Sequence, residues 1–168
     1  IHAMPASRTT SYGDGGIFST AHDLLLWDRA LHADTLISRT SYEQMIAKTR
    51  NNYGYGWEVR TWSGRRQIGH AGSGSGFSTQ IARFIDDGLT VIVLSNSDEA
   101  SAGGVAQALA AIHFGETPRM PVVTSKAMFL DAIATGGLDA GIARYREMKT
   151  ARPDAEAFKT DELLVTAG

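Results

Sequence analysis

Apolar residues recur at helical spacing in the first part of the chain. Four of them would share one face of a helix that ends near residues 32–34: Leu24, Trp27, Ala30 and Leu31. Thr20 and Asp23 precede this face at the spacing of an N-cap and its capping box, so we expect the helix to begin there. A second, shorter helix is predicted over residues 41–48.

Beyond residue 52 the pattern becomes that of β-strands. Segments rich in aromatic and β-branched residues predict four strands: residues 53–62, 66–71, 77–85 and 89–95. Ser63-Gly64 and Asp86-Asp87-Gly88 are short links of the kind that join antiparallel neighbours. The run Val91-Ile92-Val93-Leu94 is apolar without alternation, which predicts a strand that is buried on both faces and covered by helices.

Helical patterns return after the strands. One helix is predicted over residues 104–114, and two amphipathic helices follow over 126–134 and 138–149, separated by a Gly-Gly pair. We therefore predict one domain over residues 1–117 and an appended helical region over residues 118–168. The fold class should be α+β, with an antiparallel sheet of about four strands flanked by helices.

Composition and charge narrow the function classes. The formal net charge is −2 with both signs scattered, which gives no electrostatic footprint for nucleic acid or an anionic membrane. The absence of cysteine excludes disulfides, thiolate metal ligands and cysteine nucleophiles. His22, His32 and His113 show no mutual metal spacing, so we assign no metal and no cofactor.

The segment most suited to catalysis or ligand binding is residues 69–77, where a predicted strand meets a glycine-rich turn. Gly72, Gly74 and Gly76 would let a ligand lie against the main chain, whose N–H groups could stabilise an oxyanion. His70 could donate or relay a proton near neutral pH. Taken without its surroundings, His70 would be interpreted as a strand histidine bonded to a neighbour.

Three ordered blocks resemble those of the β-lactamase-related serine hydrolases, which include class C β-lactamases, penicillin-binding proteins and esterases. The blocks are Gly15-Gly16-Ile17-Phe18-Ser19-Thr20-Ala21-His22-Asp23-Leu24, Tyr53-Gly54-Tyr55-Gly56-Trp57 and Gly69-His70-Ala71-Gly72, the last followed by Gly76-Phe77 and Val93-Leu94-Ser95-Asn96. The third block resembles the His-x-Gly version of the family's Lys-Thr-Gly element. The resemblance implies a transpeptidase-like fold that is incomplete without strands from an N-terminal half.

The resemblance also implies roles for the third block. His70 takes the place of the motif lysine, and the Ser73 N–H would be an oxyanion donor, which makes these the catalytic candidates. Four residues would contact substrate: Ala71, Gly72, Gly74 and Ser75. Ala71 stands where many penicillin-recognising relatives have a hydroxyl residue, so an ester, a D-amino acid amide or a D-peptide fits at least as well as a β-lactam.

The family's nucleophile belongs to a Ser-x-x-Lys motif, assisted by a tyrosine of Tyr-x-Asn or a similar motif. Neither pattern occurs in the 168 residues. The resemblance therefore implies that the partner is the N-terminal half of the same enzyme, and that this chain alone is inactive. Because its sheet would expose an edge, we expect it to persist beside that half or as a homo-oligomer.

Two alternatives remain open at this point. The chain could be a non-catalytic binding or sensor module of the same fold, or an interaction domain in which the helical tail matters more than the cleft. Residues 1–5 do not look like a natural start and residues 162–168 stop inside an apolar periodic stretch, so both ends are expected to be cut. Composition does not decide the cellular compartment, whereas the family resemblance favours a periplasmic or secreted protein.

Overall fold

The computed structural model describes residues 13, 15–74, 76–97, 100–121 and 125–151. They form two compact units. The first comprises the described residues up to 97 together with 102–121, and the second comprises 100–101 together with 125–151. The assignment of residues 1–117 and 118–168 to a hydrolase half and an appended region stays a prediction.

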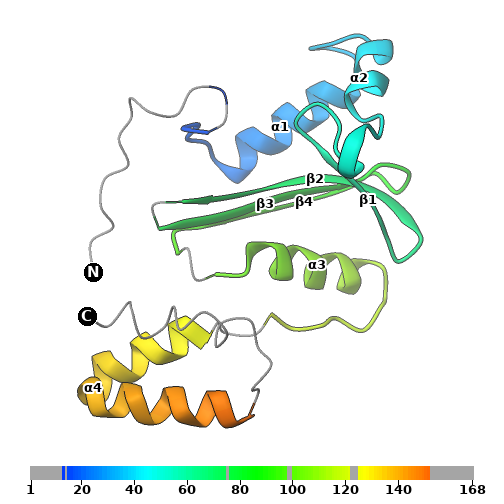
Figure 1. Ribbon diagram of the computed structural model, residues 1–168. Helices are drawn as coiled ribbons and strands as arrows, with labels where there is room; N and C mark the ends of the chain where they lie inside the picture. The colour runs from blue at the N-terminus through cyan, green and yellow to red at the C-terminus, as the bar shows by residue number, and fades with distance from the viewer. Residues whose placement is uncertain (1–12, 14, 75, 98–99, 122–124, 152–168) are drawn as a thin grey trace. The chain divides into compact units, whose positions relative to one another are not determined.

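The first unit is built on a four-stranded antiparallel sheet whose spatial order, β1-β2-β3-β4, follows the chain. The strands are β1 (Glu58–Trp62), β2 (Arg65–Gly74), β3 (Phe77–Phe84) and β4 (Leu89–Ser95). Ser63 and Gly64 link β1 to β2, and both have positive φ, which suits the twist of a tight hairpin. The predicted antiparallel sheet is confirmed (Figure 1).

The first strand is shorter than its sequence pattern predicted. It begins at Glu58 instead of residue 53, and Tyr53 contributes only an isolated bridge to Glu58. Gly56 has a φ of 79°, a conformation that interrupts an extended strand. The aromatic residues between 53 and 57 therefore form a loop whose composition imitates a strand.

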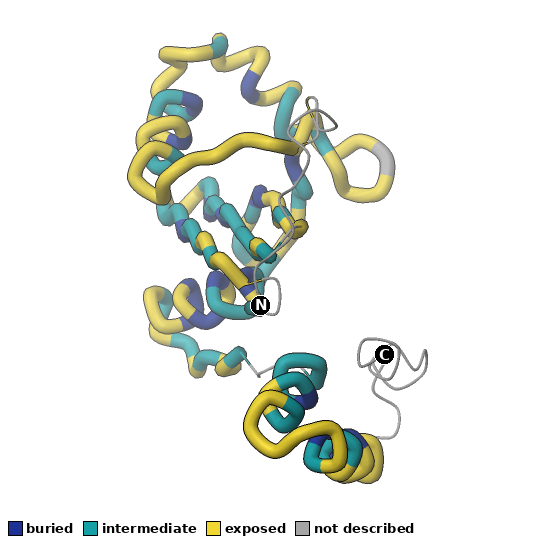
Figure 2. The backbone as a smooth tube through the Cα atoms, turned by 90° about the vertical axis from the view of Figure 1, so that its left-hand side faces the viewer, coloured by how far each residue is buried: buried dark blue, intermediate teal, exposed yellow. Residues whose placement is uncertain are grey.

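Helices cover both faces of the sheet. The helix α1 (Ala21–His32) begins where predicted, because Thr20 Oγ1 accepts a hydrogen bond of 3.1 Å from the Asp23 N–H. Helix α2 (Arg39–Met45) lies on the same side as α1, and α3 (Ala102–His113) lies on the other (Figure 1). Buried positions are found on strands and helices, while the connecting loops are mostly exposed (Figure 2).

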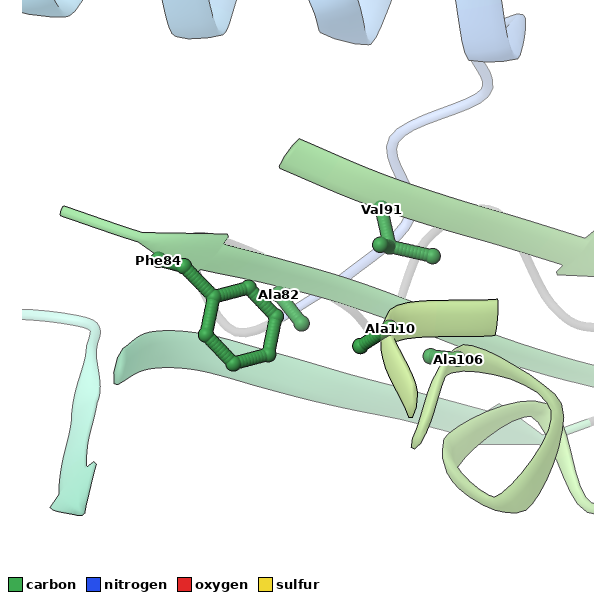
Figure 3. Close-up of a cluster of buried hydrophobic side chains, with 5 residues drawn as sticks. All are labelled: Ala82, Phe84, Val91, Ala106 and Ala110. Carbon is green, nitrogen blue, oxygen red and sulfur yellow. The ribbon is translucent and has the colours of Figure 1, made fainter. Parts of the chain in front are cut away.

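Each face has its own apolar core. On the α3 side, Ala106 and Ala110 are small enough to let the helix approach Ala82, Phe84 and Val91 closely (Figure 3). The core on the side of α1 and α2 consists of Leu31, Tyr42, Trp57 and Ile68.

Strand β4 is in contact with α1 and with α3, as its apolar sequence predicted. Val91 is 8% exposed, whereas Leu94 is 40% exposed. The prediction of burial on both faces is therefore wrong at Leu94.

The second unit contains α4 (Ser125–Ala151), two helical segments that meet at Gly137, where φ is 77°. Phe129, Tyr145 and Met148 form its core. A Cβ at Gly141 would lie 2.3 Å from Ile133 Cγ1, so the two segments approach closely there. In the described part of the chain, no helix is long and apolar enough to cross a membrane.

Candidate active site

The candidate site lies along the end of β2 that extends beyond β1. Pairing with β1 reaches only Gly69, opposite Glu58, whereas pairing with β3 continues to Gly74, opposite Phe77. Among the described residues, 70–74 therefore have a neighbouring strand on one side only (Figure 1). Alternate residues of such an edge direct their backbone N–H and C=O groups away from the sheet, where an extended ligand or another strand can pair with them.

Strand alternation divides the predicted site residues between the two faces of the sheet. His70 and Gly72 share the face of Ile68, on the side of α1 and α2, and Ala71 and Ser73 share the opposite face. The Ser73 side chain is thus not beside the His70 ring. Any catalytic role of Ser73 rests on its backbone N–H, as the family resemblance implies.

The glycines of this edge are explained by space and by backbone conformation. A Cβ at Gly72 would lie 2.5 Å from Thr79 Oγ1, so a side chain there would force the Thr79 side chain to shift. Gly74 has a φ of 149°, which L side chains rarely adopt. Ser75 lies outside the described residues. The roles assigned to these residues and to Ala71 in substrate binding stay predictions.

His70 is exposed and is held at both ring nitrogens. Nδ1 lies 2.6 Å from the Ala71 carbonyl oxygen, and Nε2 lies 2.7 Å from the hydroxyl of Tyr53. The two rings meet edge to face, with centroids 5.8 Å apart. The structure therefore adds Tyr53 to the candidate site.

Sequence reasoning placed Tyr53 on a strand and did not connect it with His70. A usable signal was present in the Ser63-Gly64 turn, which fixes the register of β1 against β2 and pairs Glu58 with Gly69. Residues just before 58 must then lie near residues just after 69. The chain does not continue this register before Glu58: it turns back, so that Tyr53 bridges Glu58 and its hydroxyl reaches His70. This reversal, with Gly56 at a φ of 79°, is what the sequence pattern did not reveal.

Two ion pairs, Arg65–Asp87 and Arg66–Asp86, lie at the other end of β2. Arg66 Nη2 and Nε donate hydrogen bonds of 2.6 and 2.8 Å to the carboxylate of Asp86. These bonds, together with the charge of Arg66, lower the pKa of Asp86. Both side chains are largely exposed, so this pair belongs to a solvated corner of the sheet and not to the site.

Several large apolar side chains of the first unit are exposed. They include Ile17, Phe18, Leu26, Trp27, Phe77 and Leu94. Trp27 stacks on Trp57 at a centroid distance of 5.7 Å and is still 42% exposed.

Characterised proteins are similar to about two thirds of this chain. Penicillin-binding protein 4* of Bacillus subtilis (strain 168) is 36% identical over 118 residues, which cover 65% of this chain and 26% of that protein. A D-aminopeptidase of Cereibacter sphaeroides (strain ATCC 17029) is 31% identical over 114 residues, which cover 64% and 22%. The chain thus spans about a quarter of the length of these relatives.

The fold is similar to that of a solved structure, the octameric penicillin-binding protein homologue from Pyrococcus abyssi. The TM-score is 0.60, with 24% identity, over 71% of this chain and 30% of that one. This likeness confirms the predicted α+β, penicillin-binding-protein-like architecture. The family model described as Beta-lactamase matches residues 2–114, which is more than half of the sequence, and the chain therefore belongs to the beta-lactamase family.

Proposed function

We propose that this chain forms one wall of the active site of a serine hydrolase that transfers an acyl group to water through a serine ester. The observation that carries the proposal is the free edge of β2 at residues 70–74, with His70 exposed beside it. An extended acyl substrate could pair with this edge while a backbone N–H stabilises the developing oxyanion. His70 would orient the substrate or assist proton transfer.

The nucleophile must come from another part of the protein. Neither Ser-x-x-Lys nor Tyr-x-Asn occurs in this sequence, and the relatives are about four times as long as the matched region. The exposed apolar side chains on and near α1, such as Phe18 and Trp27, would be covered by the half that carries these motifs. The resulting site would have one wall from each half.

The substrate class that fits best is an ester or an amide of a D-configured residue. One relative is a D-aminopeptidase and another is a penicillin-binding protein, which favours acyl substrates of this kind. Ala71 offers no hydroxyl to a substrate carboxylate, which makes a β-lactam a less suitable substrate.

Two measurements test the proposal: native mass spectrometry identifies a partner chain, and hydrolysis assays measure activity. The complete protein, or this chain assembled with its N-terminal half, should hydrolyse an activated ester or a D-alanyl amide, and a serine-directed inhibitor should label the other half. This chain alone should be inactive. Inhibitor-sensitive hydrolysis by the isolated chain would contradict the proposal that the nucleophile lies in the other half. A partner without Ser-x-x-Lys would favour the non-catalytic binding module instead.

A further inference from the structure

Tyr53 and His70 form a hydrogen-bonded pair whose geometry defines the protonation of the histidine ring. The Ala71 carbonyl oxygen can only accept, so the His70 nitrogen 2.6 Å from it, Nδ1, carries a proton. In the neutral ring Nε2 is then an acceptor, and the Tyr53 hydroxyl at 2.7 Å donates to it. Both nitrogens of the imidazole are therefore engaged within the protein.

The loop that carries Tyr53 is fixed to its surroundings by backbone hydrogen bonds. The Tyr55 N–H donates to the Met45 carbonyl at 2.9 Å, and the Gly54 N–H donates to the Trp57 carbonyl at 2.7 Å. A Cβ at Gly54 would lie 2.2 Å from the Met45 carbonyl oxygen, so the loop docks on the end of α2 only because residue 54 is glycine. Trp57, at 4% exposed, anchors the other end of the loop in the core.

Because this loop is held by backbone hydrogen bonds, the Tyr53 hydroxyl that it carries is suited to orienting the exposed His70 ring. We propose that Tyr53 is a positioning residue, which holds His70 in the Nδ1–H tautomer and in one orientation at the free edge of β2. This inference rests on the proposed function for its catalytic meaning, but the paired geometry itself can be tested without the nucleophile.

Nitrogen-15 NMR of the imidazole in the full chain tests the pairing directly. Wild-type His70 should show a protonated Nδ1 and an unprotonated Nε2 at a pH where the ring is neutral. In Tyr53→Phe the Nε2 resonance should shift and the Nε2–H tautomer should become populated. Tyr55→Phe is the matched control, because Tyr55 lies two residues away in the same loop and is 72% exposed, and its His70 spectrum should match the wild type. A wild-type ring that is mainly Nε2–H, or a Tyr53→Phe spectrum identical to the wild type, would overturn the proposal.

Kinetics of the complete enzyme separate positioning from a general structural role. Loss of one neutral hydrogen bond to His70 should lower kcat about fivefold, while KM changes little and Tyr55→Phe changes neither. Equal losses in Tyr53→Phe and Tyr55→Phe would contradict positioning. If the complete protein has no hydrolase activity but the NMR result holds, the proposed function fails while the Tyr53–His70 pairing stands.

Discussion

Asp28 on α1 and Arg83 on β3 form a buried ion pair, in which Arg83 Nη1 donates to Asp28 Oδ2 at 2.7 Å. The Thr90 hydroxyl donates to the same oxygen at 2.8 Å. The Asp28 side chain is 0% exposed and that of Arg83 is 15% exposed. This polar contact crosses an otherwise apolar interface and fixes α1 in one position on the sheet.

Replacing Asp28 by alanine should destabilise the fold strongly, because it leaves the Arg83 charge buried without its partner. The expected loss in the free energy of unfolding is about 3–5 kcal/mol. Chemical denaturation of the full chain would measure it.

Two further variants give this measurement its controls. Glu147→Ala removes an exposed partner of Arg144 and should cost at most about 0.5 kcal/mol. The double variant Asp28→Ala, Arg83→Leu removes both charges and should recover part of the loss. An Asp28→Ala variant as stable as Glu147→Ala would show that the pair contributes nothing to the docking of α1.

Stability should fall in alkaline solution because of Tyr42. Burial, the largest effect, raises the pKa of its hydroxyl above the ordinary value of 10.0, while the nearby charge of Arg83 lowers it by less. As pH rises past 10.0 the unfolded chain loses this proton before the folded chain does, so the free energy of unfolding decreases until the pH passes the raised pKa. Denaturation midpoints from about pH 9 to about pH 11 would record the decrease.

Tyr42→Phe should make this pH dependence weaker. The variant also loses the hydrogen bond of 2.6 Å to His32 Nε2, which should lower stability at neutral pH by about 1–3 kcal/mol. Tyr55→Phe removes an exposed hydroxyl and should leave the alkaline slope unchanged. Equal slopes in the wild type and Tyr42→Phe would rule out Tyr42 as the source.

Gly69 faces the backbone of β3 with little room for a side chain. A Cβ there would lie 2.6 Å from the backbone oxygen of Ile81, so Gly69→Ala should cost about 1–3 kcal/mol. Gly103→Ala in α3 is the matched control, because its Cβ would meet only Gln80 Oε1 at 3.4 Å and alanine favours a helix. Thermal unfolding should place the two variants on opposite sides of the wild type, and a neutral Gly69→Ala would mean that the strands can separate without cost.

The order and pairing of the secondary structure could be predicted because local signals agreed. Thr20 and Asp23 marked the start of α1, and the turns at 63–64 and 86–88 made the strands antiparallel neighbours. The exact start of β1 was not predictable from composition. Aromatic residues are frequent in strands and in loops that pack on a core, and the docking of Gly54 on Met45 depends on tertiary structure.

The candidate site was predictable only along the strand that contains it. The sequence pattern predicted a strand over residues 66–71 with a glycine-rich turn after it, whereas β2 continues to Gly74. The hydroxyl of Tyr53 reaches His70 from 17 residues away because Tyr53 bridges Glu58, whose partner on β2 is Gly69. Asp28 was missed for a similar reason. Asp28 lies on the same helix face as the buried Leu31, where a carboxylate is stable only because Arg83 of β3 donates a hydrogen bond to it. That contact depends on tertiary structure.

His70 itself provides the sharpest test of the candidate site in the complete protein. If the ring assists proton transfer or orients the acyl group, His70→Ala should lower kcat/KM about 100-fold or more, within the range for a positioned acid or base. His70→Lys restores the residue type of the related family motif and should retain more activity than alanine. His113→Gln, an exposed histidine at the end of α3, should behave like the wild type. Steady-state hydrolysis of one activated ester by all four proteins decides the matter, since an unchanged rate in His70→Ala would leave the free edge of β2 as the only contribution of this strand.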